Sequence, residues 1–137
     1  MAETLTFRRL FHYALDQISI TIPVRLQCGD QQSVFTAKVD TGASFCIFAR
    51  AHGEELGLDI GAGRPQRIGT VMGSFLTFAH PVTLSVLEIS FETTVYFAEE
   101  ASFNRNVLGQ QGWLDRLRLG LVDYEGKLYL SDYNDVL

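Results

Sequence analysis

The chain has 137 residues, of which 47% are hydrophobic and 20% charged, so it is long and apolar enough to bury the core of one domain. Its formal net charge of −5 argues against a nucleic-acid partner, because contacts with a phosphate backbone need a cationic surface. No apolar run approaches the length that crosses a bilayer, and the N-terminal residues lack the layout of a signal peptide, so we expect a cytoplasmic location and no membrane partner.

The first third of the chain alternates apolar and polar residues, which is typical of β-strands. In residues 18–27 one face carries only aliphatic side chains: Ile18, Ile20, Ile22, Val24 and Leu26. Pro23 falls on the other face and lacks an N–H, so we expect the strand to be paired on one side there. A turn at residues 29–30 then predicts a hairpin, whose second arm over residues 33–40 ends at Asp40.

The middle of the chain predicts shorter elements. The apolar residues 45–48 indicate a short buried strand, and residues 49–58 indicate two weak helical turns. Residues 59–66 contain several glycine and proline breakers, which favour a loop. Residues 67–78 predict a hairpin whose tip we place at residues 72–74.

The last part of the chain predicts two more hairpins and a helix. Residues 81–97 and residues 118–131 alternate in the way that paired strands do. Between these hairpins Trp113, Leu114 and Leu117 stand at helical spacing, which indicates a short helix. At that spacing we interpret Trp113 as a core anchor rather than as an aromatic that stacks on a ligand.

Together these elements predict an all-β fold, a small closed β-barrel or sandwich with one short C-terminal helix. We expect a single domain over residues 1–137. Its core spans residues 18–131, an extended N-terminal arm covers residues 1–17, and a C-terminal tail covers residues 132–137.

Asp40 lies at the end of a predicted strand, in the sequence VDTGASFCIF. An aspartate there commonly starts a turn, and Gly42 would then supply the positive φ angle. The flanking residues on both sides are apolar, however: Phe35, Ala37, Val39, Phe45, Ile47 and Phe48. An exposed turn does not need such flanks, so we favour a carboxylate that is held there for chemistry.

The motif VDTGAS resembles the active-site motif of aspartic proteases, in which an apolar residue precedes Asp, then Thr or Ser, then Gly. Downstream, Val107, Leu108 and Gly109 resemble the second signature of these enzymes, two apolar residues and a glycine before a short helix. The hairpin around Gly73 lies between the two motifs, where the family carries a flap. Order and spacing resemble the retropepsin-like branch, the single-domain relatives of retroviral proteases, which implies a retropepsin-like acid protease fold.

The resemblance also implies a homodimer. The chain has one Asp-Thr-Gly sequence, whereas the chemistry of the family needs two carboxylates that share a proton. Asp40 from each protomer would be the catalytic residue of an aspartic endopeptidase that activates water without a metal or cofactor. The resemblance assigns the active-site loop to Thr41, Gly42, Ala43 and Ser44. It assigns the flap and its contacts with a peptide or protein substrate to Val71, Met72, Gly73 and Ser74.

Some positions depart from the retroviral pattern. Many retroviral enzymes have an acid where this chain has Ser44 and an arginine where it has Gln110, and those two residues form an ion pair. Both residues are neutral here, so we expect a polar contact or none. Asp132 and Asp135 in the tail would repel their copies at a two-fold axis, so we expect a dimer sheet that is weak or built differently.

Three functions remain open from the sequence. They are an active homodimeric aspartic endopeptidase, a retropepsin-fold dimer that binds peptides or proteins without cutting them, and a domain that only oligomerises. The intact Asp-Thr-Gly favours the first. We expect no metal site, because His12, His52 and His80 lie far apart in the sequence, and we interpret Cys28 and Cys46 as reduced, buried or half-buried thiols.

Overall fold

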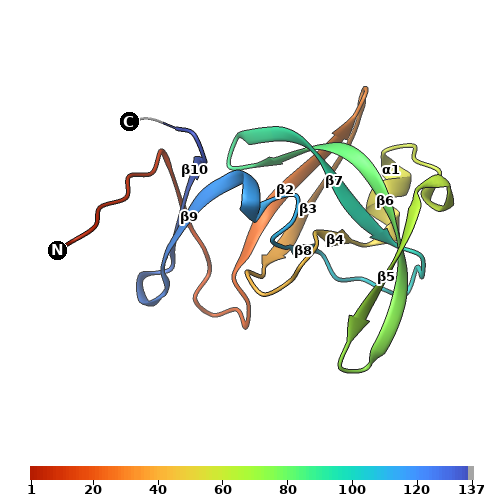
Figure 1. Cartoon of the computed structure of the whole chain (residues 1–137), viewed down its shortest axis with the longest axis horizontal. Coiled ribbons are helices and arrows are strands. Elements are labelled where there is room, and N and C mark those ends of the chain that lie inside the picture. Colours follow the sequence, from red (N-terminus) through yellow and green to blue (C-terminus); the bar gives the residue numbers. More distant parts are fainter. Residues whose placement is uncertain (136–137) are drawn as a thin grey trace.

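The computed structural model describes residues 1–135, which form two β-sheets and one short α-helix (Figure 1). A three-stranded sheet has the order β1-β10-β9, and a seven-stranded sheet has the order β2-β3-β8-β4-β7-β6-β5. The strands are β1 (Arg9–His12), β2 (Thr21–Cys28), β3 (Gln31–Val39), β4 (Ile47–Phe48), β5 (Arg64–Thr70), β6 (Gly73–Val86), β7 (Ile89–Ala98), β8 (Val107–Leu108), β9 (Leu117–Val122) and β10 (Lys127–Asp132). The predicted all-β class is therefore confirmed.

Strands β2 and β3 form the first predicted hairpin, with its turn at residues 29–30. The alternation correctly predicts the buried face, because Ile22, Val24 and Leu26 are at most 1% exposed. The prediction for Ile18 is wrong, since β2 begins after it and the Ile18 side chain is fully exposed.

The large sheet meets itself, because β2 also pairs with β6 over residues 25–27. Pro23 lies outside this second pairing and faces only Thr36 of β3, so its predicted one-sided pairing is confirmed. These pairings close a ring of strands, as predicted, but the two sheets together do not form a clean barrel. Strand β6 has 14 residues and is long enough to pair with β5 near its start and β2 near its end, which leaves β5 outside the ring of paired strands.

Strand β6 joins two of the predicted hairpins, since it pairs with β5 along its first part and with β7 along its second. The tip of the β5–β6 hairpin differs from the predicted residues 72–74. The turn consists of Val71 and Met72, while Gly73 already pairs with Thr70 and belongs to β6. Figure 1 shows this hairpin projecting from the body of the molecule.

Strand β5 begins earlier than the predicted loop allows. Residues 59–66 contain a 3₁₀ turn, Ile60–Ala62, and also the first residues of β5, which pair with β6. Gly63 permits this entry into the sheet, because a Cβ atom there would lie 2.3 Å from the Ala79 carbonyl oxygen. The glycine at position 63 is therefore needed for a close approach of two backbone segments, and does not indicate a loop.

The helical predictions are confirmed in one place and corrected in another. The weak turns over residues 49–58 form α1 (Arg50–Glu55). The short C-terminal helix is only a 3₁₀ turn, Leu114–Arg116, because Gly112 has a φ of 96° and Trp113 a φ of −137°, neither of which is helical. Trp113 is 1% exposed, as expected for a core anchor. Within residues 1–135, no helix is both long and apolar enough to cross a membrane.

The terminal sheet lies at one end of the molecule, close to both chain ends (Figure 1). Residues 9–12, near the N-terminus, form β1 against β10. Strands β9 and β10 make the predicted C-terminal hairpin. Val24 of the large sheet shares one buried cluster with Leu128 and Leu130 of β10, so the same core supports both sheets. The end of the predicted tail, residues 136–137, lies outside the described residues.

Candidate active site

Asp40 immediately follows β3, in a loop that its own carboxylate helps to order. The Gly42 N–H donates a hydrogen bond to Asp40 Oδ1 at 3.0 Å, and the Asp40 N–H donates to the Leu108 carbonyl oxygen at 3.0 Å. The Lys38 ammonium lies 3.9 Å from Asp40 Oδ2. The Asp40 side chain is 36% exposed, so the carboxylate is fixed in direction but open on one side.

The apolar flanks of Asp40 do not enclose its carboxylate. Val39 and Phe48 are buried in the main core, where they anchor the strands on either side of the loop, and Ile47 is buried in a smaller cluster. The flanks therefore position the acid by holding its backbone. Within a single chain, apolar side chains surround the carboxylate less than the sequence indicates.

The segment 107–111 holds the Asp40 loop in place. Strand β8 pairs with both β3 and β4, and the Gln110 N–H donates to the Ala43 carbonyl oxygen at 2.8 Å. Only glycine fits at Gly109, because a Cβ atom there would lie 2.2 Å from the Phe45 carbonyl oxygen. The two motifs recognised in the sequence are thus neighbours in space.

Gln110 makes the polar contact that replaces an ion pair. Its Nε2 donates to the Thr41 carbonyl oxygen at 2.8 Å. The acceptor is therefore the backbone of Thr41 rather than the side chain of Ser44, whose carbonyl oxygen accepts the Gln111 N–H at 2.9 Å. These hydrogen bonds from the segment after β8 order the loop and leave the Thr41 side chain exposed.

A cavity of about 370 Å³, which we call the Asp40 cleft, opens beside this loop. Its apolar walls come from the loop, from β5 and β6 and from the segment around β8: Phe45, Ile47, Ile68, Phe75, Phe103 and Val107. The rings of Phe75 and Phe103 stack with their centroids 4.8 Å apart. Three charged residues also line it, Asp40, Arg67 and Arg105. The cleft therefore combines apolar walls with a few polar groups, as peptide-binding and ligand-binding sites do.

The β5–β6 hairpin contributes its stem, not its tip, to the cleft. Residues 67–70 line the cavity, whereas none of the predicted flap residues does: Val71, Met72, Gly73 and Ser74. Val71 and Met72 are almost fully exposed. Thr70 closes the tip, because its Oγ1 accepts the Met72 N–H at 3.2 Å and donates to the Gly73 carbonyl oxygen at 2.9 Å.

Sequence reasoning missed three charged residues of this site, Lys38, Arg67 and Arg105. Lys38 stands two positions before Asp40, so strand alternation directs both toward the same face, and this signal was present in the sequence. Arg67 could have been found by placing the stem of the hairpin, rather than its tip, over the acid. No sequence signal points to Arg105, which reaches the cleft from the coil before β8.

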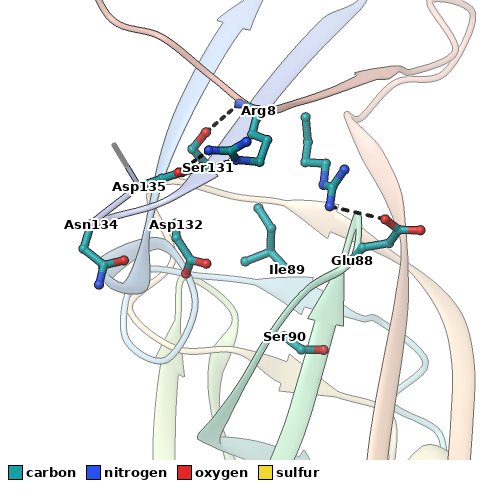
Figure 2. Close-up of a pocket in the computed structure, with 9 residues that line it drawn as sticks. Arg8, Glu88, Ile89, Ser90, Ser131, Asp132, Asn134 and Asp135 are labelled. Atoms are coloured by element: carbon teal, nitrogen blue, oxygen red, sulfur yellow. Dashed lines mark hydrogen bonds and ion pairs between the residues drawn. The ribbon is translucent and has the colours of Figure 1, made fainter. Parts of the chain in front are cut away.

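A second cavity, of about 500 Å³, lies between the terminal sheet and the turn that joins β6 to β7 (Figure 2). We call it the terminal pocket. Arg8 forms two hydrogen bonds with Asp135, at 2.8 and 2.7 Å, and its N–H donates to Ser131 Oγ at 2.6 Å. Arg9 Nη2 lies 3.4 Å from Glu88. The two cavities share no lining residue, so the terminal pocket is separate from Asp40.

The histidines have structural surroundings. Ser33 Oγ and Glu55 Oε1 both approach His52 Nδ1, at 3.1 and 3.2 Å. Because both groups meet the same ring nitrogen, the cluster cannot relay a proton as a serine hydrolase triad does. His80 contacts the Ile60 carbonyl oxygen at 2.8 Å. In the described part of the chain, no three His, Cys, Asp or Glu side chains gather closely enough to hold a metal ion.

Cys46 supports the site without offering a nucleophile. Its Sγ accepts a hydrogen bond from the Gly109 N–H at 3.4 Å. Burial raises the pKa of the Cys46 thiol to about 12, so the reactive thiolate is absent near neutral pH. Cys28 is partly exposed, and both cysteines are free, as the sequence predicted.

Comparison with known families bears directly on this arrangement of loop, hairpin and second motif. The family model described as “Aspartyl protease” matches residues 22–112, which is about two thirds of the chain and includes both motifs. The chain belongs to the aspartyl protease family. The match runs from β2 to the segment after β8, so the terminal sheet of this aspartyl protease lies outside it.

Among solved structures, this aspartyl protease is similar to the retroviral EIAV protease in complex with the inhibitor HBY-793. The two sequences are 25% identical, the TM-score is 0.55, and the match covers 73% of this chain and 88% of that one. The predicted membership of the retropepsin-like branch is thereby confirmed, and the fold is retropepsin-like. No curated protein sequence matches the chain.

Proposed function

We propose that this aspartyl protease is an endopeptidase that acts as a homodimer, with the Asp40 carboxylates of two protomers forming one active site. The observation that carries the proposal is that Asp40 is the only acid among the described residues that line its cleft. The chemistry of a shared proton needs a second carboxylate. A second copy of the chain supplies it if Asp40 lies beside a two-fold axis.

The geometry of the Asp40 loop supports a contact of this kind. Asp40, Thr41 and Gly42 are at least partly exposed, yet their backbone is held by hydrogen bonds from Gln110 and to Leu108. An exposed and ordered loop can meet its own copy with little rearrangement. A buried loop would first have to be uncovered.

In the proposed mechanism the two carboxylates share one proton, because like charges a few ångströms apart do not readily ionise together. The ionised carboxylate takes a proton from a bound water as the water oxygen attacks the peptide carbonyl carbon. The protonated carboxylate donates a hydrogen bond to the carbonyl oxygen. The C–N bond then breaks as the leaving amine receives the proton that the first carboxylate took from the water, which leaves the pair with its one shared proton. The Gly42 N–H at Asp40 Oδ1 keeps each carboxylate oriented during these steps.

The proposed substrate is an extended peptide that lies between the Asp40 loop and the β5–β6 hairpin. An extended segment can pair with the backbone of a neighbouring strand while alternate side chains enter pockets. Phe75 of β6 and Phe103 offer such a pocket next to Asp40.

The test is digestion of a peptide library by the wild type and by Asp40→Asn, from about pH 4 to pH 7. Asparagine keeps an oxygen that can accept the Gly42 N–H but cannot act as the base. We expect cleavage to fall by roughly 10²- to 10⁴-fold, the usual contribution of a general base. Thermal melting of both proteins controls for unfolding.

Sedimentation accompanies this assay. We expect the wild type and Asp40→Asn to form dimers in the same concentration range, because the substitution leaves the backbone contacts of the loop in place. Equal cleavage by both proteins, or cleavage by a strictly monomeric wild type, would show that the proposed mechanism is wrong.

The Lys38 contact favours one alternative, a dimer that binds peptides in the same cleft without cutting them. An ammonium 3.9 Å from Asp40 Oδ2 offsets the charge of the group that must accept a proton from water. Under this alternative the wild type binds library peptides at concentrations that support a dimer, and no cleavage is observed at any pH.

A further inference from the structure

We infer that the Asp40 cleft selects peptides that carry an acidic side chain close to the bond to be cut, and that Arg67 and Arg105 recognise this side chain. The inference rests on the proposed function, because it takes the cleft to be the place where a peptide binds. It adds a substrate class to that function.

The two arginines reach the cleft from two different elements. Arg67 belongs to the stem of the β5–β6 hairpin, and Arg105 precedes β8, next to the segment that holds the Asp40 loop. Both are exposed, and both line the cavity together with Asp40. A peptide that fills this cavity therefore lies beside two arginines.

Neither guanidinium is used by the fold. Within residues 1–135, no ion pair joins Arg67 or Arg105 to a carboxylate. Among the described residues, the one hydrogen bond of the Arg67 side chain is a long one, 3.4 Å, to Ser74 Oγ in the same hairpin. A guanidinium offers five donors and pairs readily with a carboxylate through two of them. These donors remain available to a ligand.

The charge balance of the cleft is opposite to that of the whole protein. The chain has a formal net charge of −5, but two arginines and a single acid line the cavity. The charge of that acid is itself met by the Lys38 ammonium, 3.9 Å away. The cleft is thus a locally cationic, apolar-walled site, which attracts an anionic ligand more strongly than an open surface would.

The apolar walls decide what kind of anion fits. Phe75 and Phe103 stack against each other, and Ile68 packs on the same small cluster. These groups favour an organic ligand with a large apolar side chain beside its charge over a small inorganic ion. Since an extended peptide advances about 3.3 Å per residue, a cavity of about 370 Å³ spans only a few positions. The acidic residue should therefore lie within a few positions of the scissile bond.

The experiment uses pairs of peptides derived from one library hit. Each pair differs only by Glu→Gln or Asp→Asn at one position, and the position is moved along the peptide. We expect the wild type to cut the acidic member of a pair more efficiently, by roughly tenfold in kcat/KM at the best position, the size expected of a charge-assisted hydrogen bond. The preference should weaken as ionic strength rises.

Arg67→Gln and Arg105→Gln should each reduce the ratio of kcat/KM for the acidic peptide to kcat/KM for its neutral partner by about threefold to tenfold. Arg64→Gln is the matched control. Arg64 is an exposed arginine on the same strand, three positions earlier and hence on the opposite face, and it does not line the cleft. The control should cut both peptides like the wild type.

Binding measured on Asp40→Asn separates this inference from the proposed function. If peptides are cut with no preference for acidic residues, the inference is overturned and the endopeptidase stands. If nothing is cut but Asp40→Asn binds acidic peptides, and Arg67→Gln in that background abolishes the preference, the inference stands and the endopeptidase does not. If the protein neither cuts nor binds them, both are wrong.

Discussion

The two cavities of this protease use charged side chains in opposite ways. In the terminal pocket, Arg8 and Arg9 each meet a carboxylate of the same chain. In the Asp40 cleft, Arg67 and Arg105 meet none among residues 1–135. The terminal pocket is nevertheless the larger, about 500 Å³ against about 370 Å³. In this protein, unpaired charged side chains therefore distinguish the candidate binding cavity from the structural one better than cavity volume does.

The difference follows from what each region does for the fold. The terminal pocket joins the first and last parts of the chain (Figure 2). One ion pair links Arg8, just before β1, to Asp135, just after β10, and the other links Arg9 of β1 to Glu88 in the turn between β6 and β7. The Asp40 cleft lies between a loop and a hairpin that already have their own backbone hydrogen bonds. Its two arginines consequently have guanidinium donors available to a ligand.

The largest loss of stability and activity is expected at Gly109, where close backbone contacts hold the Asp40 loop. In Gly109→Ala the new Cβ atom would lie 2.2 Å from the Phe45 carbonyl oxygen and 2.8 Å from that of Ala43, so the Asp40 loop must shift. We expect a loss of about 1–3 kcal/mol in the free energy of unfolding. Since a displacement of about 1 Å can cost 100-fold in rate, kcat/KM should fall by about that factor. Denaturant titration and peptide cleavage measure the two effects.

Gly61→Ala is the control for this variant, because a Cβ atom at Gly61 has no neighbour within 4 Å and the residue needs no positive φ. It should fold and cut like the wild type. A Gly109→Ala protein with unchanged kcat/KM would mean that the second motif does not position the Asp40 loop.

A smaller, pH-dependent effect is expected in the terminal pocket. The Arg8 guanidinium, which donates two hydrogen bonds to Asp135, holds the pKa of that carboxyl below its ordinary value of 3.8. The pair therefore stabilises the fold fully above the unfolded pKa, and this contribution disappears as pH falls through the lower folded pKa. Asp135→Asn should melt slightly below the wild type at about pH 6, and the gap should begin to narrow at about pH 4 and close at lower pH.

Thermal melting of both proteins over that pH range checks this prediction, and cleavage of the paired peptides serves as its control. A melting difference that does not change with pH would show that the ion pair is not its cause. A shift in peptide preference in Asp135→Asn would contradict the division of roles between the two cavities.

Local patterns in the sequence predict the parts of the fold that depend on nearest neighbours. Alternation predicts β2 and β3 because each strand buries one face, as Ile22, Val24 and Leu26 show. The Asp40 loop is predictable for a similar reason. Its residues 40–42 form a compact turn closed by the acid itself, and Gly109 is required by the close approach of the Ala43 and Phe45 backbone that follows this turn.

Other features depend on pairings between distant residues, which local patterns do not contain. The second pairing of β2 with β6, which sets the shape of the large sheet, joins residues 25–27 to residues 83–85. Strand β1 pairs with β10, at the other end of the sequence. Arg105 enters the cleft only because β8 lies between β3 and β4. The hairpin tip was misplaced by one or two residues for a local reason, since Gly73, with a φ of 127°, suits the strand entry as well as a turn.

The central claim is that Asp40 is half of an active site, and mixing of chains tests it most directly. Wild type is held at a fixed concentration that supports dimers, an equal amount of Asp40→Asn is added, and time is allowed for protomers to exchange. With random pairing about one quarter of the dimers keep two Asp40 residues, so total cleavage should fall to about half of its value without the variant. Cleavage that stays unchanged after the variant is added would mean that each chain acts with its own Asp40 alone, which contradicts the account.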